Sequence, residues 1–272
     1  MLDISRIIAG LVISTAIGWL AYRRRSLSRS GWLGAIITGT LTFGFGGWTW
    51  GLTLIAFFLS SSVLSHYKQQ RKQQLAGEKF EKGGQRDLAQ TLANGGAGAA
   101  LALLYGVSGE PAWVLAMFAG VMATVTADTW ATELGVLNRS KPRLVTTLQP
   151  VAPGTSGGIT WAGTLAGVGG ALFIGVCLML FYRGEYGVWA GWLVLAAVVG
   201  GPGGSLIDSL LGATLQAMYG SSDGNSTERA IGRDGAPNQH TRGWQWLNND
   251  AVNLLSSLGG AIFALTAYIF VH

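Results

Sequence analysis

Acidic and hydroxyl side chains interrupt one of the most apolar stretches of this sequence. In ADTWATELG, residues 127–135, Asp128 and Thr132 share one helical face, and Thr129 and Glu133 share the adjoining face. A charged side chain at mid-bilayer costs roughly 2.5–3.5 kcal/mol, and neighbouring carboxylates repel each other unless a cation lies between them. Because Mg²⁺ prefers one or two carboxylates plus phosphate oxygens and water, this stretch indicates a divalent-cation site. A helix–helix hydrogen bond or ion pair is the structural alternative.

A further acid lies in GPGGSLIDSLLGATLQ, which begins at residue 201. Ser205, Asp208 and Ser209 recur at helical spacing on one face, opposite leucine and isoleucine. The glycines and the proline predict a helix broken near residues 200–204, where irregular backbone is tolerated if it lines a cavity or is buried. The structural alternative is a kink that serves packing alone, but such a kink would not require a carboxylate. Asp208 is therefore the third candidate metal ligand, and the two serines are candidate substrate contacts.

Two other polar stripes follow the same spacing. The first consists of Arg86, Gln90 and Asn94, and the second of Asn249, Asn253, Ser256 and Gly260, with Asp250 alongside. The first stripe would direct a guanidinium group and two amides into a polar cavity. The structural alternatives are an interfacial helix turn for the first stripe and a helix cap for the second.

The loop KPRLVTTLQPVAPGTSGGIT, residues 141–160, combines cations with a glycine-rich turn that leads into a helix. Consecutive backbone N–H groups, two hydroxyls and a helix N-terminus form a physically sound anion site, with a plain N-cap turn as the alternative. The candidate anion ligands are Lys141, Arg143, Gly154, Thr155, Ser156, Gly157 and Gly158. Neither a Walker A sequence nor a Rossmann fingerprint is present, so a nucleotide site here would be of another kind.

The composition shows what positions these residues. Hydrophobic residues make up 49% of the chain and charged residues 11%, against about 25% charged in a soluble domain. We therefore expect one integral-membrane domain over residues 1–272, an all-α polytopic transmembrane helix bundle with about 8 spans of sufficient length. The predicted spans are residues 4–22, 31–46, 48–65, 88–105, 111–137, 159–181, 188–219 and 251–270.

The placement of Lys and Arg predicts the orientation. With eight crossings, four loops share one side and carry 16 of the 18 Lys and Arg residues. The positive-inside rule makes these loops cytoplasmic and leaves the N-terminus outside; they are residues 23–30, 66–87, 138–158 and 220–250. The candidate residues fall near the cytoplasmic ends of their helices, so we expect the active site at that face. The excess of Lys and Arg lies in these loops, where the membrane orientation accounts for it, so we expect no nucleic-acid partner.

The sequence resembles the integral-membrane phytyl-phosphate kinase family of tocopherol and phylloquinone synthesis, which has bacterial and archaeal relatives. The resemblance covers nearly all of the chain from about residue 30. The motifs are GQRDLAQTLANGG, ADTWATELG, PRLVTTLQPVAPGTSGGIT, GSLIDSLLGATLQ and NDAVNLLSS. In layout, the chain is also similar to the CTP-dependent phytol and dolichol kinases, and more distantly to the cytidylyltransferases that make CDP-activated lipids.

The resemblance implies transfer of the γ-phosphate of CTP, or of another nucleoside triphosphate, to phytyl or a related prenyl monophosphate in the membrane lipid. It implies that Asp128 and Asp208 hold Mg²⁺ or Mn²⁺, with help from Glu133, and that residues 154–158 cradle the triphosphate. Arg86 and the cations of the 141–160 loop would neutralise the acceptor or transferred phosphate. An acceptor that is already an anion needs no strong general base.

Two other functions fit the same residues. A lipid cytidylyltransferase would use the same metal and CTP but release pyrophosphate. A transporter of anionic solutes would couple its acids to ion movement, although the one-sided placement of the polar residues argues against it. The nucleotide base, the prenyl chain length and the oligomeric state, a homo-oligomer included, stay open.

Overall fold

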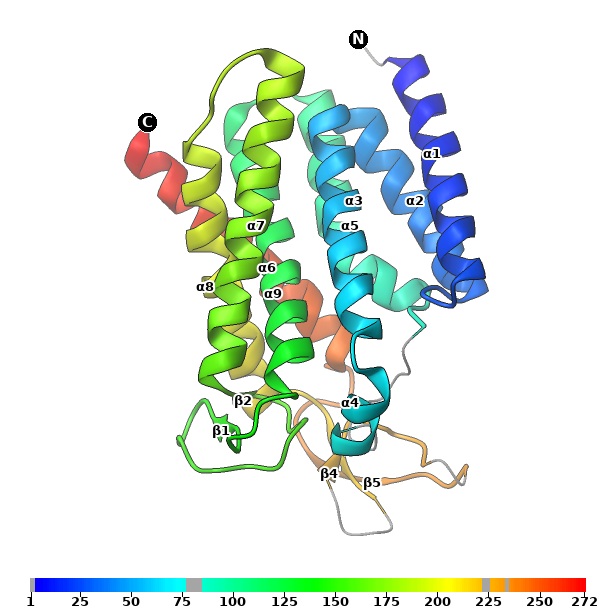
Figure 1. Cartoon of the computed structure of the whole chain (residues 1–272), viewed down its shortest axis with the longest axis vertical. Coiled ribbons are helices and arrows are strands. Elements are labelled where there is room, and N and C mark those ends of the chain that lie inside the picture. The colour runs from blue at the N-terminus through cyan, green and yellow to red at the C-terminus, as the bar shows by residue number, and fades with distance from the viewer. Residues whose placement is uncertain (1–2, 77–84, 222–225, 233–234) are drawn as a thin grey trace.

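Long helices account for most of the chain (Figure 1). The structure is a computed structural model that describes residues 3–76, 85–221, 226–232 and 235–272. Parts of the predicted loops 66–87 and 220–250 lie outside the described residues. The helices are α1 (Ile4–Arg23), α2 (Arg29–Gly46), α3 (Trp48–His66), α4 (Gln69–Ala76), α5 (Leu88–Val107), α6 (Ala112–Gly135), α7 (Trp161–Tyr186), α8 (Trp192–Thr214) and α9 (Asn249–Val271).

The eight predicted apolar segments each correspond to one long helix, and the all-helical membrane bundle is confirmed. Among the described residues, six helices are long and apolar enough to cross a membrane by length and composition, namely α1, α3, α6, α7, α8 and α9. The two remaining long helices, α2 and α5, are rich in glycine and pack against each other. The prediction of about eight crossings is consistent with this arrangement, since α2 runs beside α1 and α3 (Figure 1).

The predicted break near residues 200–204 is wrong, because α8 runs continuously through Pro202. The glycines around Pro202 serve close helix packing instead. A Cβ atom on Gly200 would lie 2.7 Å from the Cα atom of Gly120 on α6, and one on Gly201 would lie 2.6 Å from the Cβ atom of Ala171 on α7. α8 therefore stays helical while its backbone approaches its neighbours.

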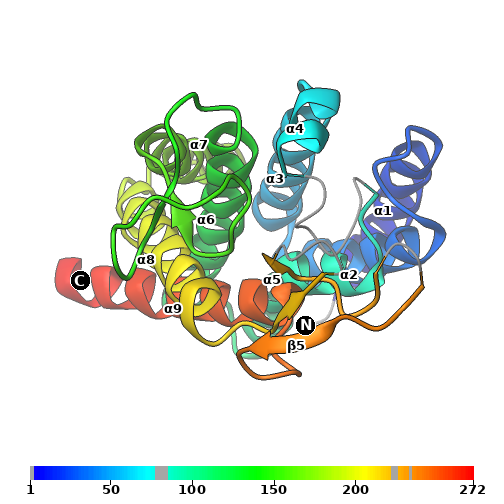
Figure 2. The same cartoon turned by 90° about the horizontal axis from the view of Figure 1, so that it is seen from below.

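Helix α6 is the centre of the core. Nearly all of its residues from Val114 to Ala127 are buried, and Phe118 stacks on Trp50 of α3 with ring centroids 4.0 Å apart. Figure 2 shows α6, α7, α8 and α9 gathered on one side and α1, α2 and α3 on the other, while α5 packs against both α6 and α2. This packing fixes the end of α6 that carries Asp128 and Glu133.

Short strands occupy the loops at one end of the bundle. β1 (Arg143–Leu144) pairs antiparallel with β2 (Gly158–Ile159). A second sheet has the order β4-β3-β5 and consists of β3 (Met218–Gly220), β4 (Ser226–Thr227) and β5 (Gln239–Arg242). Helical periodicity did not predict these strands. Their pairing holds the loops together at the ends of the helices.

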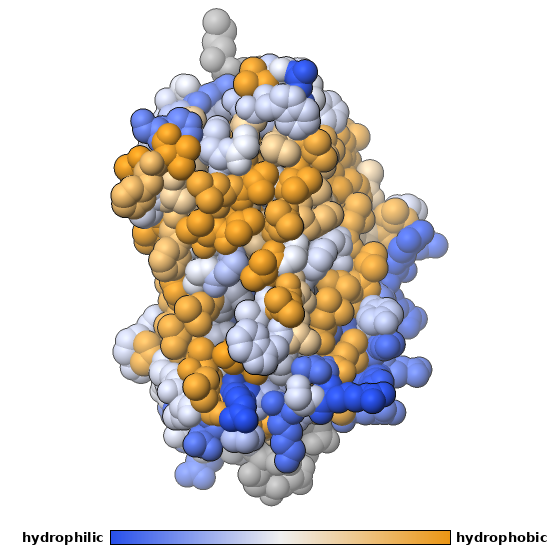
Figure 3. All heavy atoms as spheres, turned by 60° about the vertical axis from the view of Figure 1, so that its left-hand side comes forward, coloured by the Kyte–Doolittle hydropathy of each residue, from blue (hydrophilic) through white to orange (hydrophobic). Residues whose placement is uncertain are grey.

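The loops gather at the end of the bundle opposite both termini (Figure 1). Figure 3 shows a broad apolar band across one face, with most of the strongly polar side chains toward its lower end. Large apolar side chains of α7 and α9 are exposed, among them Trp161, Ile262 and Phe270, as expected for helices that face lipid. The assignment of the loop end to the cytoplasm stays a prediction from the charge pattern.

Candidate functional site

Asp128 of α6 and Asp208 of α8 face each other closely enough for their carboxylates to repel. Both side chains are partly buried. The Ser256 hydroxyl on α9 donates to Asp208 Oδ2 at 3.1 Å. Within the part of the chain that the structure describes, neither carboxylate has a cationic partner, and Asp128 accepts no hydrogen bond. Two neighbouring acids without a counter-charge are a candidate site for a cation.

Glu228 adds a third negative charge near Asp208. Its side chain is buried at 8% exposure, and Oε1 accepts a hydrogen bond from Gln216 Nε2 at 3.0 Å. Gln216 Oε1 in turn accepts from the Ser156 hydroxyl at 2.6 Å. Glu228 is thereby connected to the glycine-rich loop through hydrogen bonds.

Glu133 does not join Asp128 and Asp208. It forms an ion pair with Lys72 of α4, with Nζ and Oε2 2.5 Å apart, and accepts from the Ser65 hydroxyl at 2.6 Å. Five residues along a helix correspond to a rotation of about 140° from one side chain to the other, so Glu133 points toward α3 and α4. No group of three His, Cys, Asp or Glu side chains able to hold a metal occurs among the described residues. The predicted three-carboxylate metal set is therefore not assembled.

Arg86 lies just before α5, with its guanidinium group 5.8 Å and 5.9 Å from the ring centroids of Phe57 and Phe58. Its backbone is fixed, because Arg86 O accepts from Ser28 N at 3.0 Å and a Cβ atom on Gly31 would collide with that same oxygen. Burial lowers the pKa of Arg86, while the charge of Glu133 acts in the opposite direction. Within the described residues, the guanidinium group has no hydrogen-bond or ion-pair partner.

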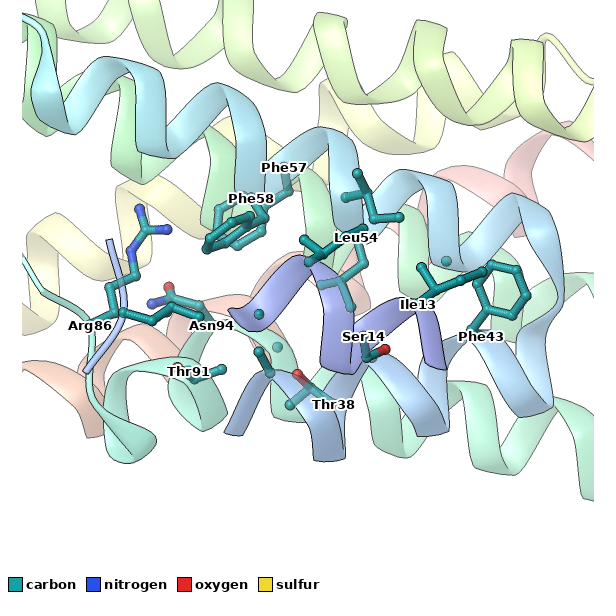
Figure 4. A pocket seen from close by; sticks show the side chains of 18 of the residues that line it. Ile13, Ser14, Thr38, Phe43, Leu54, Phe57, Phe58, Arg86, Thr91 and Asn94 are labelled. Atoms are coloured by element: carbon teal, nitrogen blue, oxygen red, sulfur yellow. The ribbon is translucent and has the colours of Figure 1, made fainter. Parts of the chain in front are cut away.

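Arg86 and Asn94 line the same cavity, which lies between α1, α2, α3 and α5 (Figure 4). The cavity itself has a volume of about 80 Å³ and opens into a larger space outside it. Figure 4 shows Arg86 and Asn94 toward one end and Ile13 and Phe43 toward the other. The Asn94 amide donates to Gln90 O at 2.9 Å, so it is held within its own helix.

The GTSGG loop packs on the end of α8. Gly154 and Gly157 have φ angles of +75° and +77°, and a Cβ atom on Gly157 would lie 2.5 Å from that of Ala213. The Thr155 hydroxyl donates to Ala152 O, and Gly158 N donates to Thr155 O. The amides of Gly154, Ser156 and Gly157 donate to no acceptor among the described residues. These three amides remain available to an anion, whereas the two hydroxyls are used inside the protein.

The other predicted cations lie on the loop surface. Lys141 is exposed, and Arg143 Nη1 donates to Leu148 O at 2.8 Å, which closes its own loop. Thr132 is also exposed. Ser205 and Ser209 are half-buried on α8 beside Asp208.

The N-cap of α9 is Asn248, whose side chain accepts from Ala251 N at 3.0 Å. The alternative of a cap at Asn249 or Asp250 is therefore wrong by one or two positions. Asp250 is buried in the first helical turn, and the Asn253 carbonyl accepts from the Ser256 hydroxyl. Ser256, which belongs to this stripe, is the residue that donates to Asp208.

Four residues of this region were not predicted: Lys72, Gln216, Glu228 and Arg242. Arg242 Nη2 donates to Gly212 O at 2.8 Å, and Nη1 donates to Ala213 O, so Arg242 caps the C-terminus of α8. Burial lowers the pKa of Arg242. Glu228 and Arg242 lie in a polar loop and Lys72 in the short polar helix α4, where hydrophobic periodicity does not distinguish a buried side chain from a solvated one. Gln216 lies just after α8.

Comparisons with known proteins place the chain in a family. The family model of the integral membrane protein DUF92 matches residues 12–261. Protein PGR of Arabidopsis thaliana is 31% identical over 98% of this chain and 97% of its own length. An uncharacterised membrane protein of Methanocaldococcus jannaschii is 31% identical over 97% and 94% of the two chains. The chloroplastic protein VTE6 of Arabidopsis thaliana is 27% identical over 90% of this chain and 66% of its own length.

No solved structure matches the chain. The family match covers most of the helices, the acid pair and the glycine-rich loop. The chain therefore belongs to the DUF92 family of integral membrane proteins.

Proposed function

We propose that this protein is a membrane prenyl-phosphate kinase, which transfers a phosphoryl group from CTP or another nucleoside triphosphate to phytyl or a related prenyl monophosphate. The observation that carries the proposal is the pair Asp128 and Asp208, two carboxylates on adjacent helices with no counter-cation among the described residues. One or two carboxylates together with phosphate oxygens are the ligand set that Mg²⁺ prefers. The motif resemblance to phytyl-phosphate kinases supports the prenyl acceptor.

Each group of residues would have a separate role in the reaction. Asp128 and Asp208 would hold Mg²⁺, which supplies neutralisation of the phosphate charge when bound. The amides of Gly154, Ser156 and Gly157 would donate to the triphosphate, and Arg86 to the acceptor phosphate. An oxygen of the acceptor phosphate bonds to the γ-phosphorus while the bond to the β–γ bridging oxygen breaks, so that a nucleoside diphosphate and a prenyl diphosphate form.

The site needs no general base, because the acceptor oxygen already carries negative charge. Catalysis then depends on positioning and on charge stabilisation. Glu133 has a structural part here, since its ion pair with Lys72 anchors α4 on α6. It would influence the acceptor only through its charge, which acts on Arg86.

The test uses purified protein in detergent with Mg²⁺, phytyl monophosphate and γ-labelled CTP. We expect label in phytyl diphosphate, and a loss of transfer of at least a hundredfold in Asp128→Asn and in Asp208→Asn. The control is Asp3→Asn, because Asp3 is an exposed acid that caps the N-terminus of α1. Label released as pyrophosphate would indicate the cytidylyltransferase instead, and near-normal turnover in either variant would contradict the role of that residue.

A further inference from the structure

We propose that the cavity between α1, α2, α3 and α5 is the binding site for the prenyl chain of the acceptor, with its phosphate on Arg86. This assignment rests on the proposed function, because it takes a prenyl monophosphate as the acceptor. It differs from a tail that stays in bulk lipid, since one defined internal cavity would hold the chain next to the helix bundle (Figure 4).

The walls of the cavity suit a linear chain of isoprene units, which is apolar along its whole length. Side chains such as Ile13, Ile17 and Leu54 line it from α1 and α3. The Thr38 hydroxyl on the α2 wall donates to Gly34 O at 2.9 Å and so presents no free polar group. On α2, the lining extends from Ala35 to Phe43, which is about 12 Å along the helix axis. The lining of the cavity is thus elongated and mostly apolar.

The cationic group lies toward one end of this space. The Arg86 guanidinium group has no hydrogen-bond or ion-pair partner among the described residues, although Phe57 and Phe58 enclose it. Its backbone is fixed by the α1–α2 loop, so its position does not depend on a ligand. An arginine with free donors binds a phosphate with two parallel hydrogen bonds. An apolar chain with one terminal phosphate therefore complements both parts of the cavity.

The phosphate end also lies toward the acid pair. The charge of Glu133 acts on Arg86, and Glu133 and Asp128 lie on the same helix about 7.5 Å apart along its axis. Asp128 in turn faces Asp208. A phosphate held by Arg86 would thus be at the same end of the bundle as the proposed metal and donor, although Glu133 and Asp128 face different sides of α6. The cavity is partly open.

The test narrows the cavity without changing the acid pair. Ile13→Trp fills the space from α1, and Leu54→Trp fills it from the opposite wall. The matched control is Val12→Trp, because Val12 is next to Ile13 on the same helix but 61% exposed on the lipid side. Binding of geranylgeranyl monophosphate and of dimethylallyl monophosphate is measured by equilibrium binding in nanodiscs, without nucleotide or Mg²⁺. Variants that do not elute as a single folded species are replaced by the variant on the other wall.

We expect Ile13→Trp and Leu54→Trp to weaken binding of the long-chain probe at least tenfold and to leave the short-chain probe within twofold. Val12→Trp should leave both unchanged, and Arg86→Gln should weaken both. The assignment is overturned if the long-chain probe binds both tryptophan variants normally, or if bound phospholipid occupies the cavity and neither probe displaces it. Loss of phosphoryl transfer with this binding pattern intact would refute the proposed function alone. Normal transfer to the long-chain probe in both tryptophan variants would refute the cavity assignment alone.

Discussion

Removing one partner of the Lys72–Glu133 ion pair should destabilise the protein without abolishing metal binding. Nζ and Oε2 lie 2.5 Å apart, and the side chains are 10% and 21% exposed. At an effective dielectric constant of about 20, the gross attraction at this distance is roughly 6–7 kcal/mol. Desolvation of both charges offsets most of it, and loss of one partner from a buried pair costs about 3–5 kcal/mol.

Two contacts reduce that cost here. Lys72 Nζ also donates to Leu64 O at 2.5 Å, and Glu133 keeps the hydroxyl of Ser65. Because each group retains a hydrogen bond, we expect Glu133→Gln and Lys72→Met each to lower the free energy of unfolding by about 2–3 kcal/mol. The double variant should lose at least about 1 kcal/mol less than the sum of the single losses, since the two charges are coupled.

The assay is equilibrium unfolding in mixed micelles, followed by circular dichroism. The matched control is Arg6→Gln, which removes the exposed pair with Asp3 and should cost less than about 1 kcal/mol. Metal dependence of the purified variants is measured in parallel. Strictly additive losses would contradict the coupling. A drop in Mn²⁺ affinity in Glu133→Gln as large as in Asp128→Asn would return Glu133 to the metal site.

Three further substitutions test the packing and the anion contacts. Gly157→Ala should weaken CTP binding at least tenfold by equilibrium dialysis, because the left-handed backbone and the contact with Ala213 exclude a Cβ atom; unchanged affinity would remove the loop from the nucleotide site. Gly260→Ala should lower the free energy of unfolding by about 1–3 kcal/mol, since its Cβ atom would collide with the Thr124 hydroxyl between α6 and α9, and a neutral result would contradict this close packing. Arg86→Lys should raise the KM for the prenyl monophosphate more than it lowers kcat, because a lysine lacks the paired donors; an effect on kcat alone would refute acceptor binding.

The helices could be predicted because hydrophobicity over twenty residues is a strong signal in a membrane protein. The same signal misread the glycines around Pro202, because a glycine that breaks a helix and one that permits close packing look alike in sequence. Gly200 and Gly201 contact α6, α7 and α9, and only the arrangement of those helices reveals this.

The candidate site was predictable where a charge lies inside an apolar run, as with Asp128 and Asp208. It was not predictable where residues in polar segments become buried, as with Lys72 and Glu228. Glu133 shows the limit of spacing arguments. The sequence shows that Glu133 lies close to Asp128 on the same helix, with its side chain rotated about 140° from that of Asp128. The sequence does not show that α4 places Lys72 on that side of the helix, where it pairs with Glu133.

Metal binding by Asp128 and Asp208 is the central claim, and Mn²⁺ titration by electron paramagnetic resonance measures it directly. In nanodiscs with CTP, the unmodified protein should bind Mn²⁺ and Mg²⁺ should displace it, whereas Asp128→Asn and Asp208→Asn should each lose at least tenfold in affinity. Equal Mn²⁺ affinity in the unmodified protein and in both variants would contradict the account.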